Sequence, residues 1–205
     1  MKLIKLSLIL IFIAGNLYSQ EIGAGLVKVW TDNYEIENPS GYSIYLAQRI
    51  GRLGLKLEYV SADNQRRYYG NINGGFLIAP QDFSQESILS ESTYRSVEGS
   101  LQIPDLLSLS KNSLNIGGGI AFDKFTRVKT GQSTLKSYNT SQNKFGLFYS
   151  ISISHRNLFG FPIKLELIFK QKFLFSSGYS TDTDQPFAAS MDIKELQLNL
   201  AFRFI

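Results

Sequence analysis

The last ten residues of the chain alternate between apolar and polar or small side chains. Gln197, Asn199, Ala201 and Arg203 separate a set of large apolar residues, which are Leu196, Leu198, Leu200, Phe202 and Phe204. Because strand side chains point to alternate faces, one face of this segment is wholly apolar, whereas a helical repeat would mix the two sets. The pattern predicts a two-faced β-strand.

The same alternation recurs along the chain and predicts eight strands. Their expected ranges are 21–30, 41–51, 54–65, 93–109, 113–126, 143–157, 162–176 and 189–205. Most exceed the usual strand length of about five or six residues and are long enough to cross a bilayer at a tilt. Tight turns alternate with long polar segments at 31–40, 66–92, 127–142 and 177–188. This order predicts an all-β fold, an eight-stranded antiparallel up-and-down transmembrane β-barrel with four long loops facing outward.

The first 19 residues have the character of a secretory signal peptide. Lys2 and Lys5 precede a short apolar run, and Ser19 supplies a small residue before Gln20. The run is too short for a membrane-spanning helix of about 20 residues. We therefore expect residues 1–19 to be removed and residues 20–205 to form one barrel domain in the outer membrane.

Composition excludes several classes of function. The chain contains no cysteine, which rules out disulfides, thiolate metal sites and a lipidated cysteine at the cleavage point. Its formal charge of +4 includes the two lysines of the leader, so the remainder is too weakly basic to indicate nucleic acid as a partner.

Alternation also predicts which side chains face the barrel interior. In the seventh strand Leu165 and Leu167 would face lipid, while Lys164 and Glu166 point inward, where charge is less costly than in hydrocarbon. The residues expected inside are Arg49, Lys56, Glu58, Glu98, Asp123, Lys164, Glu166, Lys170, Lys172, Glu195 and Arg203. An eight-stranded barrel is only wide enough for side chains to fill it, so we expect these charges to pair and plug the interior.

Two segments do not follow the simple pattern. Strict alternation from Ile103 would turn Asp105 toward lipid, and Pro104 cannot donate a ladder hydrogen bond, so a β-bulge at Pro104 is expected. In the first strand we expect Val27 and Val29 to face lipid, because that arrangement hides Lys28.

Aromatic residues gather near the predicted strand ends, as in the two interfacial girdles of membrane barrels. The set expected at the periplasmic side is Phe159, Phe161, Phe202 and Phe204. The set expected at the outer side is Trp30, Tyr42, Tyr68, Tyr69, Tyr94 and Phe125. Tyr68, Tyr69 and Tyr94 could equally be loop-contact residues. The opposite direction of alternation, with apolar residues inside, would describe a soluble lipocalin-like barrel, but the strand lengths and girdles favour the membrane.

No motif in the sequence indicates catalysis, a cofactor or a metal. Gly117, Gly118 and Gly119 lie inside a predicted strand without the Lys-Ser or Lys-Thr of a phosphate loop, so we interpret them as residues that let the barrel bend. His155 is the only histidine and falls at the periplasmic end. We therefore expect no catalytic, cofactor-binding or metal-binding residues and no enzymatic activity.

Three segments together resemble the small outer-membrane β-barrel proteins of Bacteroidetes, often called porin-family or OmpA-like barrel domains. They are Leu101-Gln102-Ile103-Pro104 with Leu106-Leu107, the run from Leu114 to Ala121, and the alternating C-terminal strand. The resemblance implies insertion by the barrel-assembly machinery, which recognises an aromatic C-terminal strand. Phe202 and Phe204 supply aromatics, although the last residue is Ile205.

These observations lead to one functional expectation with two alternatives. We expect a monomeric, non-enzymatic outer-membrane protein in contact with outer-membrane lipid and lipopolysaccharide, whose loops serve envelope integrity, adhesion or partner binding. The alternatives are a lipid A-modifying outer-membrane enzyme and a narrow solute channel.

Overall fold

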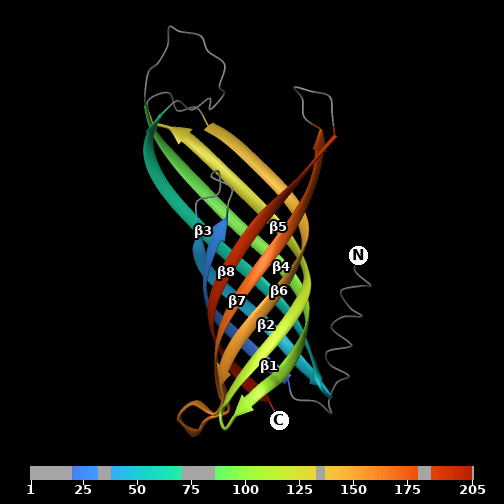
Figure 1. Cartoon of the computed structure of the whole chain (residues 1–205). Coiled ribbons are helices and arrows are strands. Elements are labelled where there is room, and N and C mark those ends of the chain that lie inside the picture. Colours follow the sequence, from blue (N-terminus) through green and yellow to red (C-terminus); the bar gives the residue numbers. More distant parts are fainter. Residues whose placement is uncertain (1–19, 32–37, 71–85, 133–136, 180–185, 205) are drawn as a thin grey trace, which may run out of the picture.

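Eight antiparallel strands close into a barrel in chain order, with β1 paired to β8 (Figure 1). The computed structural model describes residues 20–31, 38–70, 86–132, 137–179 and 186–204. The strands are β1 (Gln20–Thr31), β2 (Ser40–Ile50), β3 (Leu53–Gly70), β4 (Glu86–Leu109), β5 (Asn112–Gly131), β6 (Ser137–His155), β7 (Ile163–Tyr179) and β8 (Pro186–Phe204). A short 3-10 turn, η1 (Leu158–Gly160), lies between β6 and β7. The predicted fold class is confirmed, whereas the predicted signal peptide lies outside the described residues.

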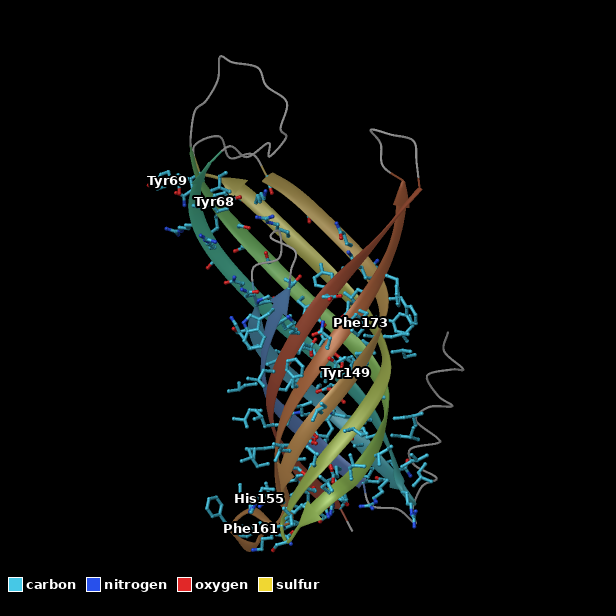
Figure 2. All side chains as sticks on the ribbon, viewed as in Figure 1. Tyr68, Tyr69, Tyr149, His155, Phe161 and Phe173 are labelled. Carbon is cyan, nitrogen blue, oxygen red and sulfur yellow. The ribbon has the colours of Figure 1, made fainter. Side chains whose placement is uncertain are left out.

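The direction of the alternation is the one that the sequence predicts. Lys164 and Glu166 point into the barrel while Leu167 is exposed on its outer surface, and the same division runs along β3, β5, β6 and β8. Figure 2 shows aromatic side chains such as Tyr149 and Phe173 on the outside of the ribbon. No helix in the described ranges is long and apolar enough to cross a membrane. The exposed apolar band on the strands is the surface that would meet lipid.

The predicted facing of β1 is wrong. Val29 is fully buried and Val27 nearly so, whereas Leu26 is 71% exposed on the outer surface. The reason lies in the position of Lys28, which is near the C-terminal end of β1. Its Nζ donates hydrogen bonds to the carbonyl oxygen of Asn38 at 2.7 Å and to Ser40 Oγ at 3.0 Å. Lys28 therefore finds polar partners without entering the interior.

The β-bulge expected at Pro104 is confirmed. The register between β4 and β5 shifts between Ile103 and Leu107, and Asp105 has a φ of 60°. This conformation turns the carboxylate inward, where Arg49 reaches it at 2.8 Å and Arg156 also forms an ion pair with it. The bulge thus moves an acidic side chain away from the lipid face.

Six strands extend further toward the long-loop end of the barrel, which is the upper end in Figure 1, than the sequence pattern predicts. Segments 66–70, 86–92, 127–131, 137–142, 177–179 and 186–188 were expected in long loops, but the structure continues β3 to β8 through them. In the added parts of β3 to β6 the sequence is mostly polar at both odd and even positions, so the apolar alternation that marks a membrane strand is missing. The result is a raised wall of β3, β4, β5 and β6 beside a raised β7–β8 hairpin (Figure 1).

Close strand approach explains two of the three consecutive glycines of β5. A Cβ at Gly119 would contact the carbonyl oxygen of Gly99 and come within 2.8 Å of the Ser100 Cα. A Cβ at Gly117 would lie 2.9 Å from Ser150 Oγ. Gly118 points outward, where a Cβ would meet only the carbonyl oxygen of Phe148 at an ordinary 3.4 Å.

We predict that Gly119→Ala destabilises the barrel and Gly118→Ala does not. The extra methyl at position 119 has backbone on one side and the Phe148 ring on the other, so overpacking should cost about 1–3 kcal/mol. The midpoint of urea unfolding in lipid vesicles measures the difference. Equal midpoints for the two variants would contradict the packing argument.

Candidate functional site

A network of buried ions fills the middle of the barrel. Lys170 Nζ lies 2.5 Å from Glu58 Oε2 and 2.6 Å from Glu98 Oε2. Lys172 Nζ lies 2.5 Å from Glu98 Oε1 and 2.6 Å from Glu195 Oε1. Lys56, Glu58, Glu98, Asp123, Lys170, Lys172 and Glu195 together form what we call the central network. Each lysine forms an ion pair with at least one carboxylate, so the cations buried here are paired.

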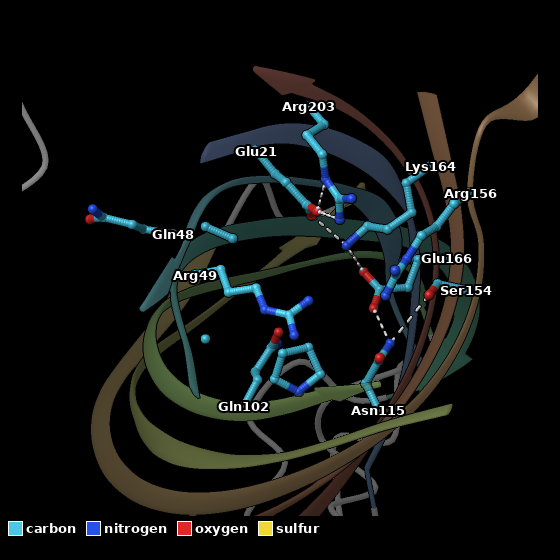
Figure 3. A pocket seen from close by; sticks show the side chains of 13 residues that line it. Glu21, Gln48, Arg49, Gln102, Asn115, Ser154, Arg156, Lys164, Glu166 and Arg203 are labelled. Atoms are coloured by element: carbon cyan, nitrogen blue, oxygen red, sulfur yellow. Dashed lines mark hydrogen bonds and ion pairs between the residues drawn. The ribbon is translucent and has the colours of Figure 1, made fainter. Parts of the chain in front are cut away.

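A second set of ions lines a cavity of about 50 Å³ at the lower end (Figure 3). Glu21 accepts from Arg203 Nη2 at 2.6 Å and pairs with Lys164 Nζ at 2.5 Å. Lys164 also forms an ion pair with Glu166, and Glu166 accepts a hydrogen bond of 2.6 Å from Ser152 Oγ. Arg156 lies just beyond β6, where burial lowers the pKa of its guanidinium. This lower network is a polar closure of the barrel end.

The two networks balance each other in charge. The basic side chains that form these ion pairs are Lys56, Lys164, Lys170, Lys172, Arg49, Arg156 and Arg203. The acidic ones are Glu21, Glu58, Glu98, Glu166, Glu195, Asp105 and Asp123. The excess of acid in the central network matches the excess of base below it. The inward placement that the sequence predicts is thus confirmed, and the structure adds Glu21, Asp105 and Arg156 as ion-pair partners.

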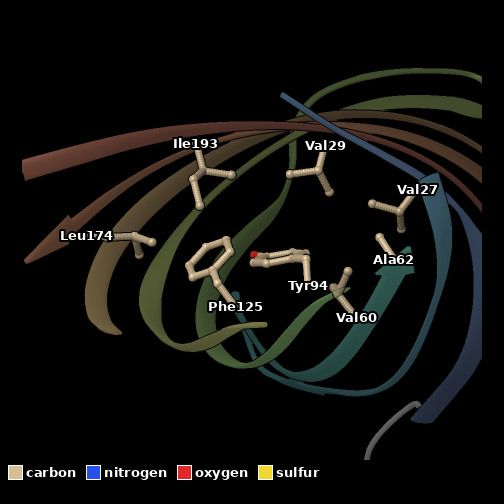
Figure 4. Close-up of a cluster of buried hydrophobic side chains, with 8 residues drawn as sticks. All are labelled: Val27, Val29, Val60, Ala62, Tyr94, Phe125, Leu174 and Ile193. Carbon is tan, nitrogen blue, oxygen red and sulfur yellow. The ribbon is translucent and has the colours of Figure 1, made fainter. Parts of the chain in front are cut away.

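An apolar cluster lies inside the barrel above the central network (Figure 4). It consists of Val27, Val29, Val60, Ala62, Tyr94, Phe125, Leu174 and Ile193, and we call it the apolar plug. On each strand that contributes to both, the plug residue lies nearer the upper end, as Phe125 does relative to Asp123 and Leu174 relative to Lys172. Water and ions moving along the axis would meet this layer.

The plug corrects the prediction that Tyr94 and Phe125 belong to the outer aromatic girdle. Both rings point inward and are buried, with their centroids 5.1 Å apart. The hydroxyl of Tyr94 lies 2.6 Å from Asp123 Oδ1 and 2.7 Å from Glu195 Oε1, and Lys172 Nζ donates to it at 2.5 Å. Tyr94 therefore joins the plug to the central network. Counting alternate positions upward from Glu98 would have placed it inside.

The inner face of the raised wall forms a basic surface above the plug. Strand register places Arg66, Ser90 and Lys129 in one row across β3, β4 and β5, and Asn64, Ser92 and Arg127 in the row below. Both rows face the same side as Tyr94 and Phe125. Arg127 Nε donates a hydrogen bond of 3.1 Å to Ser90 Oγ. We call this face the outer cup.

The remaining sequence candidates lie elsewhere. His155 is at the lower end of β6 (Figure 2), with Nδ1 2.7 Å from Asn112 Oδ1. Tyr69 lies near the upper end with its side chain exposed (Figure 2), as do Trp30 and Tyr42 at their strand ends. Within the described part of the chain, no group of three or more histidine and carboxylate side chains is arranged so that it could hold a metal ion.

Comparisons with known proteins identify the fold. No protein-family model and no curated protein sequence matches the chain. A major outer membrane protein of Thermus thermophilus superposes with a TM-score of 0.59 at 12% identity, covering 90% of this chain and 99% of that one. Neisserial surface protein A gives 0.53 at 14% identity, covering 91% and 97%. Ail, the attachment invasion locus protein of Yersinia pestis, gives 0.51 at 15% identity, covering 91% and 99%.

The fold is therefore that of a small outer-membrane β-barrel protein. The exposed apolar band and the sheltered ions of this chain agree with that class. The protein is an integral β-barrel of the cell outer membrane.

We predict that Lys172→Met destabilises the barrel by about 3–5 kcal/mol, because it leaves buried carboxylates without their cation. Lys194→Met is the matched control, since Lys194 lies on β8 with its side chain exposed outside the barrel. Urea unfolding in lipid vesicles, followed by tryptophan fluorescence of Trp30, measures both. A Lys172 variant as stable as the control would show that the central network is not required.

Proposed function

We propose that the protein is a non-enzymatic outer-membrane barrel with a closed interior, which presents its raised outer part to partners at the cell surface. The observation that carries this proposal is the division of the interior. Paired ions and the apolar plug fill the membrane-spanning part, whereas the outer cup leaves basic side chains on a concave face above it. The part of the molecule suited to binding is thus the outer one.

We also propose that the barrel conducts no solute. Tyr94 and Lys172 are fully buried at the junction of plug and central network, and each is held by several polar partners. An open path would require these contacts to break together, which leaves unpaired charge in a low-dielectric interior. A narrow solute channel is the alternative that this arrangement disfavours.

We predict that the purified protein gives no conductance steps in planar lipid bilayers bathed in potassium chloride. A general porin inserted under the same conditions serves as the positive control for detection. Regular single-channel steps from the folded protein would contradict the closed interior and favour the channel alternative.

The chemistry of the outer cup favours an anionic partner. Arg127 and Lys129 face the same concave side, beside the buried Ser90 and Ser92. Guanidinium and ammonium groups bind sulfate, phosphate and carboxylate groups well. Ail, which shares the fold, has been solved in complex with the heparin analogue sucrose octasulfate. We therefore propose acidic surface polysaccharides as partners in adhesion.

We predict that Arg127→Gln combined with Lys129→Gln weakens binding of sucrose octasulfate by about tenfold, since two charge-assisted contacts are lost. Calorimetry on the full chain in detergent micelles measures the affinity, which should also fall as salt is raised. The control removes the same charge elsewhere, through Arg67→Gln on the outward face of β3 and Lys111→Gln in a periplasmic turn. Equal affinity of the two double variants, or no binding by the wild type, would contradict the proposal.

We propose that the protein is not an enzyme because of where its histidine lies. A lipid A-modifying enzyme would need a histidine, serine and carboxylate near the outer leaflet, but His155 lies at the opposite end beside Asn112. We also propose that the protein contacts lipopolysaccharide, is inserted by the barrel-assembly machinery and is monomeric. Kinship with OmpA-like barrel domains is part of the same proposal.

A further inference from the structure

Two basic side chains stand side by side on the lipid-facing surface where β4 meets β5. Arg95 and Lys124 are register partners, and both are exposed on the outside of the barrel. The next outward pair toward the periplasm is Val97 and Phe122, which belongs to the apolar band. A shallow pocket of about 150 Å³ surrounds the basic pair, lined by Thr93, Arg95, Lys124 and Thr126. The basic pair thus lies at the upper boundary of the hydrocarbon-facing surface.

This basic pair is chemically suited to a phosphate group. Within the described ranges neither Arg95 nor Lys124 takes part in an ion pair, and Asp63 of β3 lies opposite Thr93, on the side away from the apolar band. A guanidinium and an ammonium group flanked by two threonine hydroxyls offer charged and neutral donors to one small anion. The boundary position means that such an anion would carry an apolar part below it.

An apolar groove lies below the basic pair and extends from β5 across β4 to β3. Its volume is about 390 Å³, and its lining includes Gly99, Leu101, Gly118 and Ile120 of β4 and β5 and Leu55 and Leu57 of β3. Register places Gly99 opposite Ile120 and Gly118 opposite Leu101, so the two glycines are diagonal neighbours on the outward face. The groove therefore lies directly below the basic pair on the seam of β4 and β5.

The barrel itself does not require glycine at these two positions. A Cβ at Gly99 would approach only Ile120 Cγ1 at 4.0 Å, and one at Gly118 only a carbonyl oxygen at 3.4 Å. Neither residue has a positive φ. Glycine is unfavourable inside a strand, and it commonly marks a place where another molecule approaches the backbone closely. The missing side chains thus point to an occupant of the groove.

The spacing of the two features matches the depth of one lipid leaflet. Six residues separate Lys124 from Gly118, which is about 20 Å along a strand and about 15 Å along the membrane normal at a tilt near 40°. Half of a bilayer core of about 30 Å has the same thickness. A headgroup at the basic pair would place an acyl chain along the groove.

We propose that the seam of β4 and β5 is a binding site for one phosphorylated lipid of the outer leaflet, the lipid A part of lipopolysaccharide. Arg95 and Lys124 bind its phosphate, Thr93 and Thr126 complete the polar site, and one acyl chain lies over Val97 and Phe122 into the groove at Gly99 and Gly118. The site is separate from the outer cup, so it stands whether or not the cup binds a surface partner.

The test is native mass spectrometry of the full chain, extracted from outer membranes in mild detergent. The wild type should retain one lipid A molecule through delipidating washes. Arg95→Gln with Lys124→Gln should reduce the retained fraction about tenfold through the loss of two charged contacts. Gly118→Leu, which fills the groove without touching the basic pair, should reduce it as well.

Two control variants separate the site from general lipid association. Arg67→Gln with Lys194→Gln removes two other exposed outward charges, and Ala24→Leu places the same leucine side chain on the outward face of β1. Both should retain lipid A as the wild type does. Heat-modifiable migration on gels confirms that every variant is folded. Retention by the two test variants at the wild-type level would overturn the site.

Lipid exchange identifies the source of the phosphate. The delipidated protein is mixed in turn with bisphosphorylated lipid A, with dephosphorylated lipid A and with phosphatidylglycerol, and retention is compared. Preference for the bisphosphorylated form supports the proposal. Equal retention of the dephosphorylated form would overturn the role of the basic pair, and equal retention of phosphatidylglycerol would overturn the assignment to an outer-leaflet glycolipid.

Discussion

Pairing of buried charge is the constraint on which the rest of this structure depends. An eight-stranded barrel leaves no aqueous lumen, so every ion that alternation sends inward must meet a counterion there. Lys170 and Lys172 satisfy this requirement from one strand, because their ammonium groups reach carboxylates on β3, β4, β5 and β8. The central network thereby ties together strands that are not neighbours in the ring, which the backbone ladder alone does not do.

The layered interior explains how one barrel serves two environments. Toward the short-turn end the lower network surrounds a small polar cavity near Glu21 and Lys164. Toward the long-loop end the apolar plug lies between the central network and the basic residues of the outer cup. Tyr94 belongs to both layers, since its ring packs on Phe125 and its hydroxyl bonds to Asp123. The two binding sites that we propose, the cup above the plug and the outward-facing seam of β4 and β5, therefore lie outside the filled interior.

Predictions from sequence succeeded where lipid and interior differ sharply in polarity. The facing of Leu167 against Glu166 follows from alternation alone, and so does the bulge that keeps Asp105 out of the lipid. They failed where that contrast disappears. Toward the long-loop end the inner face of the strands carries polar residues as well, such as Ser90, Ser92 and Arg127, so these segments lack a clear apolar alternation and were predicted as loops. Lys28 misled the prediction for β1 because its hydrogen-bond partners lie beside the end of that strand.

The sequence by itself determined the strand number, the antiparallel order and the facing of clear apolar stripes such as that of Leu165 and Leu167, because a period of two is a local property of the backbone. Only the tertiary structure decided which ions pair, since Lys172, Glu98 and Glu195 are brought together by closure of the ring. The same holds for the apolar plug, the outer cup and the groove at Gly99 and Gly118. Each depends on strand register, and register is a relation between distant segments.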